Sequence, residues 1–270
     1  MRNKLSGCVL NCGSLDETLE SVAALMRRSA ADLRNVLIGV QLRDDACIAP
    51  EDQLLSALGY ESLEQLPSPD RIRWFHFSRV PLEITFNDGL LPTGQVLESI
   101  WIALGVVASE LVGPDVWNAF RHDFPQSQSN SARQLAVKSR RELQGPFGFL
   151  VREAGEGVIG DHKDFTAFSE VTEDICSGFR ECAGVDLGSA WQRRTSPCIV
   201  IFEVPAGDIG QHAVQAALMY AHHRLHSREQ SFACNTCFDG GGCAVSPRDI
   251  VKVIRLRKTP EESGTDFGRS

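Results

Sequence analysis

The chain has 270 residues, enough for one large domain or for one domain with a small appendage. Its formal net charge is −8 at pH 7, and its hydrophobic fraction of 43% is ordinary for a globular protein. The negative charge disfavours broad, non-specific binding to nucleic acid, because such binding depends on neutralising phosphates. No apolar run approaches the roughly 20 residues that span a bilayer, the N-terminus lacks the apolar stretch of a secretory signal, and nine scattered cysteines indicate reduced thiols. We therefore expect a cytoplasmic protein with no membrane partner.

The first part of the chain is predicted to be mostly helical. Leu19, Val22 and Leu25 recur at helical spacing. The patterns predict helices over 16–33 and 50–66, and a short strand or buried segment over 35–42. Proline residues then interrupt the chain after residue 66. We expect residues 1–69 to form a small helical N-terminal unit.

Residues 70–258 mix strand and helix patterns and are expected to form the main domain. We expect strands over 71–80, 145–153 and 197–207, helices over 94–112, 131–143, 168–182 and 213–226, and a strand, turn and strand over 243–257. The segment 197–207 is rich in β-branched and aromatic residues, and Ser169 is placed to cap the helix that follows it. Strands separated by single helices and long loops predict an α+β protein with a mixed or antiparallel sheet. Residues 259–270 are expected to be a polar tail.

The strand predicted over 71–80 carries a histidine in its middle. Because side chains alternate between the faces of a strand, Trp74, His76 and Ser78 should share one face. An imidazole and a hydroxyl on one face could bind a ligand through hydrogen bonds. The alternative is a core histidine whose ring nitrogens are satisfied by backbone groups.

Histidines and cysteines gather near the C-terminus. They are His222, His223, His226, Cys234, Cys237 and Cys243. Zinc prefers a Cys-x2-Cys pair combined with a second pair of Cys or His ligands, and a convincing second pair is lacking. A zinc deaminase would also need a His-x-Glu motif, which the chain does not contain. We expect no stoichiometric zinc, with a zinc-stapled binding domain as the alternative.

Four segments resemble a known family. They are "WFHFSRV" followed by "GLLP" (74–92), "AFSEVTEDICSGF" (167–179), "CIVIFEVPAGDI" (198–209) and "DGGGCAVSPRDIVKVIRL" (239–256). In this order they are similar to segments of the ADP-ribosyltransferases of the diphtheria-toxin and poly-ADP-ribose-polymerase type. The resemblance implies an ADP-ribosyltransferase-like split sheet, mixed or antiparallel, with NAD as co-substrate.

The resemblance also implies roles for single residues. His76 and Ser78 would contact NAD, Arg79 would pair with its pyrophosphate or be a surface charge, Phe168 or Phe179 would stack on nicotinamide, and Asp239 would be the catalytic acid. A carboxylate suits that role because positive charge develops on the sugar in the transition state. The aromatic positions hold Phe where the family has Tyr. Asp239 lies in a loop-like stretch and Asp-Gly is also a common turn, so Glu203 and Glu170 remain alternatives.

The function implied is that of an NAD-dependent mono-ADP-ribosyltransferase. Its acceptor would be a macromolecule, either protein or nucleic acid, and the basic helix 131–143 is the stretch that could approach phosphates. By analogy the chain would be a bacterial toxin, effector or defence enzyme, with room for an inhibitory partner protein. The alternative is a non-catalytic binding module of the same fold.

Overall fold

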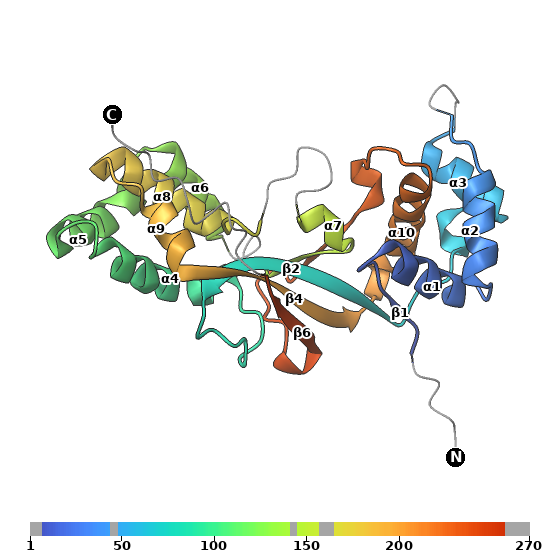
Figure 1. Cartoon of the computed structure of the whole chain (residues 1–270), viewed down its shortest axis with the longest axis horizontal. Helices are drawn as coiled ribbons and strands as arrows, with labels where there is room; N and C mark the ends of the chain where they lie inside the picture. Colours follow the sequence, from blue (N-terminus) through green and yellow to red (C-terminus); the bar gives the residue numbers. More distant parts are fainter. Residues whose placement is uncertain (1–6, 44–47, 141–144, 157–164, 257–270) are drawn as a thin grey trace, which may run out of the picture.

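A six-stranded sheet spans the middle of the molecule, and a group of helices lies at each of its two ends (Figure 1). The structure is a computed structural model, and it describes residues 7–43, 48–140, 145–156 and 165–256. The α+β class expected from the sequence is confirmed. The predicted tail 259–270 lies outside the described residues.

Two long strands form the centre of the sheet. They are β2 (Arg71–Pro81) and β4 (Thr195–Pro205), which pair antiparallel along their whole length. The sheet continues with β6 (Ile250–Arg255) beyond β4, and with β3 (Phe147–Phe149) and β5 (Cys237–Asp239) beyond β2, in the order β5-β3-β2-β4-β6. A short strand, β1 (Val9–Leu10), pairs parallel to the start of β2.

Both faces of the sheet are apolar near its centre. On the face that we call the Trp74 face, the rings of Trp74 and Phe202 both contact Phe238, at centroid distances of 5.9 and 5.2 Å. Gly148 makes this contact possible, because a Cβ there would lie 2.9 Å from the Phe202 ring. On the opposite face, which we call the Phe75 face, Phe75, Phe77 and Ile199 form a separate small core.

The helices at one end are α1 (Leu15–Leu25), α2 (Ala30–Gly39), α3 (Pro50–Leu58) and α10 (Gly210–Leu225). Helix α10 contacts each of the other three. Their buried side chains belong to the same core as Ile72 and Trp74 of the sheet. The N-terminal residues are therefore helical, as expected, but they share a core with the C-terminal half of the chain, and the domain boundary at residue 69 stays a prediction.

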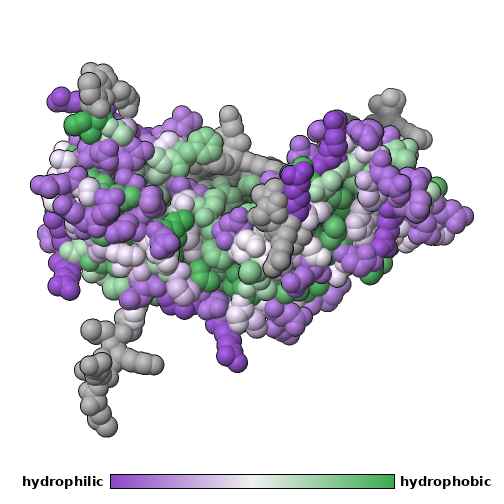
Figure 2. Space-filling view, turned by 180° about the vertical axis from the view of Figure 1, so that it is seen from behind, coloured by the Kyte–Doolittle hydropathy of each residue, from purple (hydrophilic) through white to green (hydrophobic). Residues whose placement is uncertain are grey.

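The helices at the other end build a second core. They are α4 (Thr93–Ala108), α5 (Pro114–Asp123), α6 (Asn130–Lys138), α8 (Glu170–Ala183) and α9 (Leu187–Arg194). Aromatic rings dominate it, and Trp117, Phe120 and Phe179 lie within 5.7 Å of one another between centroids. Gly178 allows α8 to approach Phe124, since an added Cβ would lie 2.0 Å from that ring. In the space-filling view, hydrophobic colour gathers over the middle of the molecule, while both helical ends are mostly polar (Figure 2).

Short helices complete the described fold. They are α7 (Arg152–Gly155) and the 3-10 turns η1 (Leu63–Gln65), η2 (Phe124–Gln126), η4 (Gly207–Ile209), η5 (Phe232–Cys234) and η6 (Pro247–Asp249).

The N-terminal prediction was wrong in two places. The single helix expected over 16–33 is broken, because Arg27 adopts a left-handed conformation with φ of 55° and Ser29 caps a new helix by accepting from the backbone N–H of Asp32. The strand or buried segment expected over 35–42 is instead mostly the second half of α2. Its apolar run was too short to distinguish strand from helix, whereas Leu33 and Leu37 bury one helical face. The Ser169 cap was correct, since its hydroxyl accepts from Thr172 N–H at 3.3 Å.

His222 of α10 and His226, the residue that caps this helix, hold the end of α2. The Nε2–H of His226 donates to Leu37 O and that of His222 donates to Val40 O, both at 3.1 Å. The two rings are stacked with centroids 4.3 Å apart. The last carbonyls of a helix lack i+4 partners. Leu37 O accepts from Val40 N–H at 3.3 Å, and the two histidines add side-chain donors at this end. Burial lowers the pKa of His222 from 6.5 to about 4, although its bond to Val40 opposes the shift.

We predict that His222 makes the fold sensitive to acid. Between pH 6.5 and 4 the unfolded chain takes up a proton at this residue that the folded chain does not, so stability falls as the pH falls. The loss amounts to about 3 kcal/mol by the time the pH reaches 4. Urea unfolding at pH 7.5 and 4.5 should show a smaller difference in His222→Gln than in the parent. The control is His212→Gln, which changes an exposed histidine of the same helix and should keep the parent's pH difference. An unchanged difference in His222→Gln would contradict the prediction.

Candidate functional site

His76 lies on β2 and bonds to the backbone of the neighbouring strand. Its Nδ1 lies 2.8 Å from the carbonyl oxygen of Phe147. The ladder between β2 and β3 consists of one pair, Phe75 with Phe149. Beyond this pair, the imidazole of His76 makes the hydrogen bond to β3. A carbonyl can only accept, and therefore Nδ1 carries the proton. In the neutral ring Nε2 is then left as a hydrogen-bond acceptor.

The protonation state of His76 follows from its surroundings. Desolvation lowers the pKa of His76, and the bond to the Phe147 carbonyl opposes this shift. The ring is therefore neutral at neutral pH. It is partly exposed at its place in the sheet, and a neutral ring with Nε2 as acceptor can accept a hydrogen bond from a hydroxyl group.

Ser78 shares the Trp74 face with His76. Its hydroxyl is partly exposed and has no hydrogen-bond partner among the residues that the structure describes. Across the sheet, Ser78 pairs with Cys198, and Cys198 pairs with Arg255. The Arg255 guanidinium donates to the carbonyl of Ile84, in the loop that follows β2. The loop 81–89 therefore borders the Ser78 end of this face.

Asp239 does not join His76. Its neighbour Phe238 packs against Trp74 on the Trp74 face, and successive side chains of a strand alternate faces. The Asp239 side chain therefore projects from the opposite face to that of His76. Its carboxylate is exposed and accepts from the backbone N–H of Gly241 at 2.8 Å, as an Asp at a turn commonly does. The sequence placed the two residues at one site, and the described geometry does not bring them together.

Arg79 is buried and bonded to backbone. It is 4% exposed, and its guanidinium donates to the carbonyls of Thr166 at 2.9 Å and Gln192 at 3.0 Å. These bonds connect β2 with the segment before α8 and with the end of α9. The structure thus gives Arg79 a packing role, in contrast to the pyrophosphate contact and the surface charge expected from the sequence.

The two candidate stacking residues lie away from His76. Phe179 is fully buried in the second helical core, against Trp117 and Phe120. Phe168 precedes α8 and packs against Gly188 of α9. The segment 167–179 belongs to a helical end of the molecule, and it presents neither ring to the Trp74 face.

Both alternative acids are held by cations. Arg73 donates to Glu203 Oε1 from Nε at 2.9 Å and from Nη2 at 2.7 Å. Glu170 lies 3.5 Å from Lys138, which also pairs with Asp174 at 2.7 Å. The basic helix expected over 131–143 ends, as α6, at Lys138, and this lysine faces acids of α8.

The C-terminal cysteines and histidines do not converge. Cys234 is buried, whereas Cys237 and Cys243 are exposed, and His222 and His226 bond to backbone carbonyls of α2 and its end. Within the described part of the chain, no group of three or more His, Cys, Asp or Glu side chains is placed to hold a metal ion.

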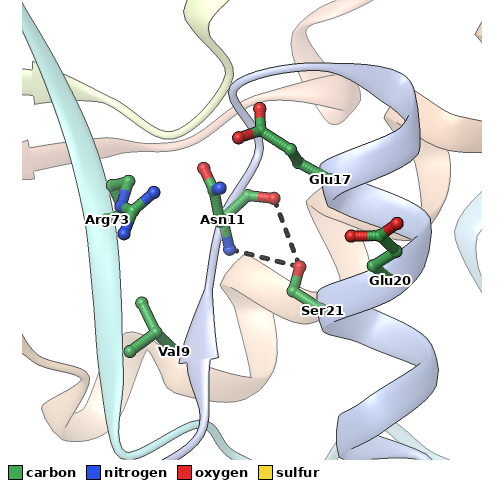
Figure 3. A pocket seen from close by; sticks show the side chains of 6 residues that line it. All are labelled: Val9, Asn11, Glu17, Glu20, Ser21 and Arg73. Carbon is green, nitrogen blue, oxygen red and sulfur yellow. Dashed lines mark hydrogen bonds between the residues drawn. The ribbon is translucent and has the colours of Figure 1, made fainter.

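A polar cavity of about 370 Å³ lies between α1 and the strands β1 and β2 (Figure 3). Its lining consists of Val9, Asn11, Glu17, Glu20, Ser21 and Arg73. Ser21 both accepts from the backbone N–H of Asn11 and donates to its carbonyl, each at 3.2 Å. Arg73 projects from the face that carries Phe75, so this cavity is separate from His76 and Ser78.

Sequence reasoning missed two features of the His76 region. One is the Phe147 carbonyl, whose only signal was the Gly-Pro break before β3. The other is Arg255, which no short-range pattern connects to the loop after β2. Both are contacts between residues more than 70 positions apart.

Comparison of the chain with protein-family models, curated proteins and solved structures finds no match. Among the helices of the described ranges, none is long and apolar enough to cross a membrane.

We predict that Arg79→Met destabilises the fold by about 2–4 kcal/mol, because it removes a buried guanidinium and its hydrogen bonds to the carbonyls of Thr166 and Gln192. Urea unfolding at neutral pH measures the change. Arg133→Met, at an exposed position of α6, is the control and should stay within about 0.5 kcal/mol of the parent. A loss in Arg79→Met no larger than that of the control would show that the bonds to Thr166 and Gln192 contribute little.

Proposed function

We propose that the protein binds NAD on the Trp74 face, at His76 and Ser78, and transfers ADP-ribose to a macromolecule. One observation carries this proposal. Three of the four segments that resemble ADP-ribosyltransferases lie side by side, although they extend from residue 74 to residue 256 of the chain. Strand β2 pairs with β4, β4 pairs with β6, and Leu90 of "GLLP" bridges to Val245 just before β6.

The residues on this face fit the ribose of NAD. His76 Nε2 can accept a hydrogen bond from a ribose hydroxyl. The Ser78 hydroxyl lies two residues further along the strand and can donate or accept a hydrogen bond. NAD would supply the ADP-ribosyl group, whose transfer breaks the bond between nicotinamide and ribose. The chain's own residues would hold and orient the ribose, which is the ordinary means by which a site increases the rate of such a step.

A second candidate function is binding without transfer. The observation that favours it is the position of Asp239, whose carboxylate projects away from the His76 face. In that case the protein would hold NAD or a related nucleotide and would not break the nicotinamide bond. The two candidates share the binding residues and differ only in turnover.

The cellular location and the biological role are part of the same proposal. A cytoplasmic location is inferred from the nine cysteines, and the role of a bacterial toxin, effector or defence enzyme is inferred from the family analogy alone.

We predict that His76→Asn weakens NAD binding about tenfold or more while the fold survives. The Asn amide can still donate toward the Phe147 carbonyl, but it lacks the Nε2 acceptor, and one lost hydrogen bond of about 1.4 kcal/mol corresponds to tenfold in affinity. Isothermal titration with NAD measures the change, and thermal unfolding checks the fold. His212→Asn, at an exposed site on α10, should bind NAD like the parent. Equal NAD affinity in His76→Asn and the parent would exclude this binding site.

We predict that Asp239→Asn transfers ADP-ribose like the parent, because its carboxylate faces away from His76. The assay follows nicotinamide release and label from NAD carrying a radioactive adenylate phosphate, with protease and nuclease digestion of the products. A loss on the order of 100- to 1,000-fold would instead restore Asp239 as the group that stabilises the transition state. If neither protein transfers label while His76-dependent NAD binding persists, the binding-only function is correct.

A further inference from the structure

The loop that follows β2 exposes two aliphatic side chains beside the proposed NAD site. Leu82 is 72% exposed and Ile84 is 41% exposed. Scattered exposed apolar residues are ordinary, but these two lie two positions apart, directly after the strand that carries His76 and Ser78.

The backbone of this loop is fixed, so the exposure of Leu82 and Ile84 does not come from a poorly anchored loop. Arg255 donates from Nη2 to the carbonyls of Ile84 and Leu82, and Ile84 N–H donates to Pro81 O at 3.2 Å. At the far end Leu90 exchanges backbone hydrogen bonds with Val245 at 3.0 and 2.9 Å.

Two residues of the loop have the left-handed conformation. Phe86 has a φ of 59°, which is uncommon for an aromatic residue. Gly89 has a φ of 87°, and a Cβ there would lie 2.0 Å from the carbonyl oxygen of Val245. The loop therefore presents Leu82 and Ile84 in a pre-organised form, which lowers the ordering cost of binding.

The ionisable side chains of the loop itself are acidic. Glu83 and Asp88 are exposed in the loop. The loop 81–89 contains no lysine or arginine. Arg248 is exposed one position after Pro247, which lies against Gly89 of the loop. Arg255 contacts the loop from the sheet, with its Nη2 bound to carbonyls and its Nη1 buried.

We propose that the loop 81–89 is the docking surface for the acceptor of the proposed transfer, and that this acceptor is a protein segment carrying lysine or arginine beside apolar side chains. Its role as acceptor surface rests on the proposed function. Leu82 and Ile84 would receive the apolar side chains, and Glu83 and Asp88 would face the basic ones. A nucleic acid docked on the loop would place phosphates against the carboxylates of Glu83 and Asp88, which is electrostatically unfavourable.

The test measures binding without NAD, by fluorescence anisotropy of three labelled probes. They are a 12-residue peptide of alternating arginine and leucine, the same peptide with glutamate for arginine, and a single-stranded 12-nucleotide DNA. The parent should bind the arginine peptide more tightly than the other two, and added salt should weaken this binding because the charges are exposed.

Two loop variants and one matched control locate the binding. Glu83→Lys/Asp88→Lys and Leu82→Ser/Ile84→Ser should each weaken the arginine peptide about tenfold or more, as loss of central interface contacts does. Asp52→Lys/Asp115→Lys makes the same change in net charge on α3 and α5 and should bind the peptide like the parent. Thermal unfolding confirms that all variants are folded.

The outcomes separate this proposal from the proposed function. Equal weakening in the control and loop variants, or tighter binding of the DNA by the parent, would overturn the docking surface. Titration of the same variants with NAD tests the proposed function separately from the docking surface. A parent that binds NAD but not the arginine peptide contradicts only the docking surface, whereas one that binds the peptide at the loop but not NAD contradicts only the proposed function.

Discussion

The pairing of β2 with β4 along their whole length is the constraint on which the rest of the structure depends. Once His76 is opposite Val200, every side chain of both strands is assigned to one face or the other. Trp74, His76 and Ser78 share a face with Phe202, and Phe75 and Phe77 share the other with Ile199. A shift of one strand by one residue would turn all of its side chains to the other face and break the packing of both cores.

This constraint also decides which polar residues can cooperate. His76 and Ser78 are neighbours on one face because a strand repeats every two residues. Asp239 projects from the other face because its neighbour Phe238 packs against Trp74 and Phe202 on this one. The position of one aromatic ring on a three-residue edge strand therefore determines the side of the sheet on which a carboxylate lies.

A second theme is the use of polar side chains as donors to backbone carbonyls. His76 donates to the carbonyl of Phe147, and Arg79 donates to those of Thr166 and Gln192. His222 donates to the carbonyl of Val40, and Arg255 donates to that of Ile84. Buried carbonyls without donors are costly, and each of these bonds joins segments that are far apart in the chain. In sequence such residues resemble candidates for ligands or catalysis. In the structure, Arg79 and His222 hold elements together. His76 does so with Nδ1, which leaves Nε2 as a hydrogen-bond acceptor.

The sequence by itself determined the features that depend on short-range patterns. The α+β class, the strands at 71–80 and 197–207, the helix after "GLLP", the Ser169 cap and the shared face of His76 and Ser78 all follow from local periodicity and capping. Only the tertiary structure decided the break between α1 and α2, the burial of Arg79 and Phe179, and the separation of Asp239 from His76. The physical reason is the distance along the chain over which each property is decided. The periodicity of a segment and the cap of a helix depend on neighbours within about four positions. The burial of a side chain and its bonding partner depend on distant segments, as in Arg79 and Gln192, which are 113 positions apart.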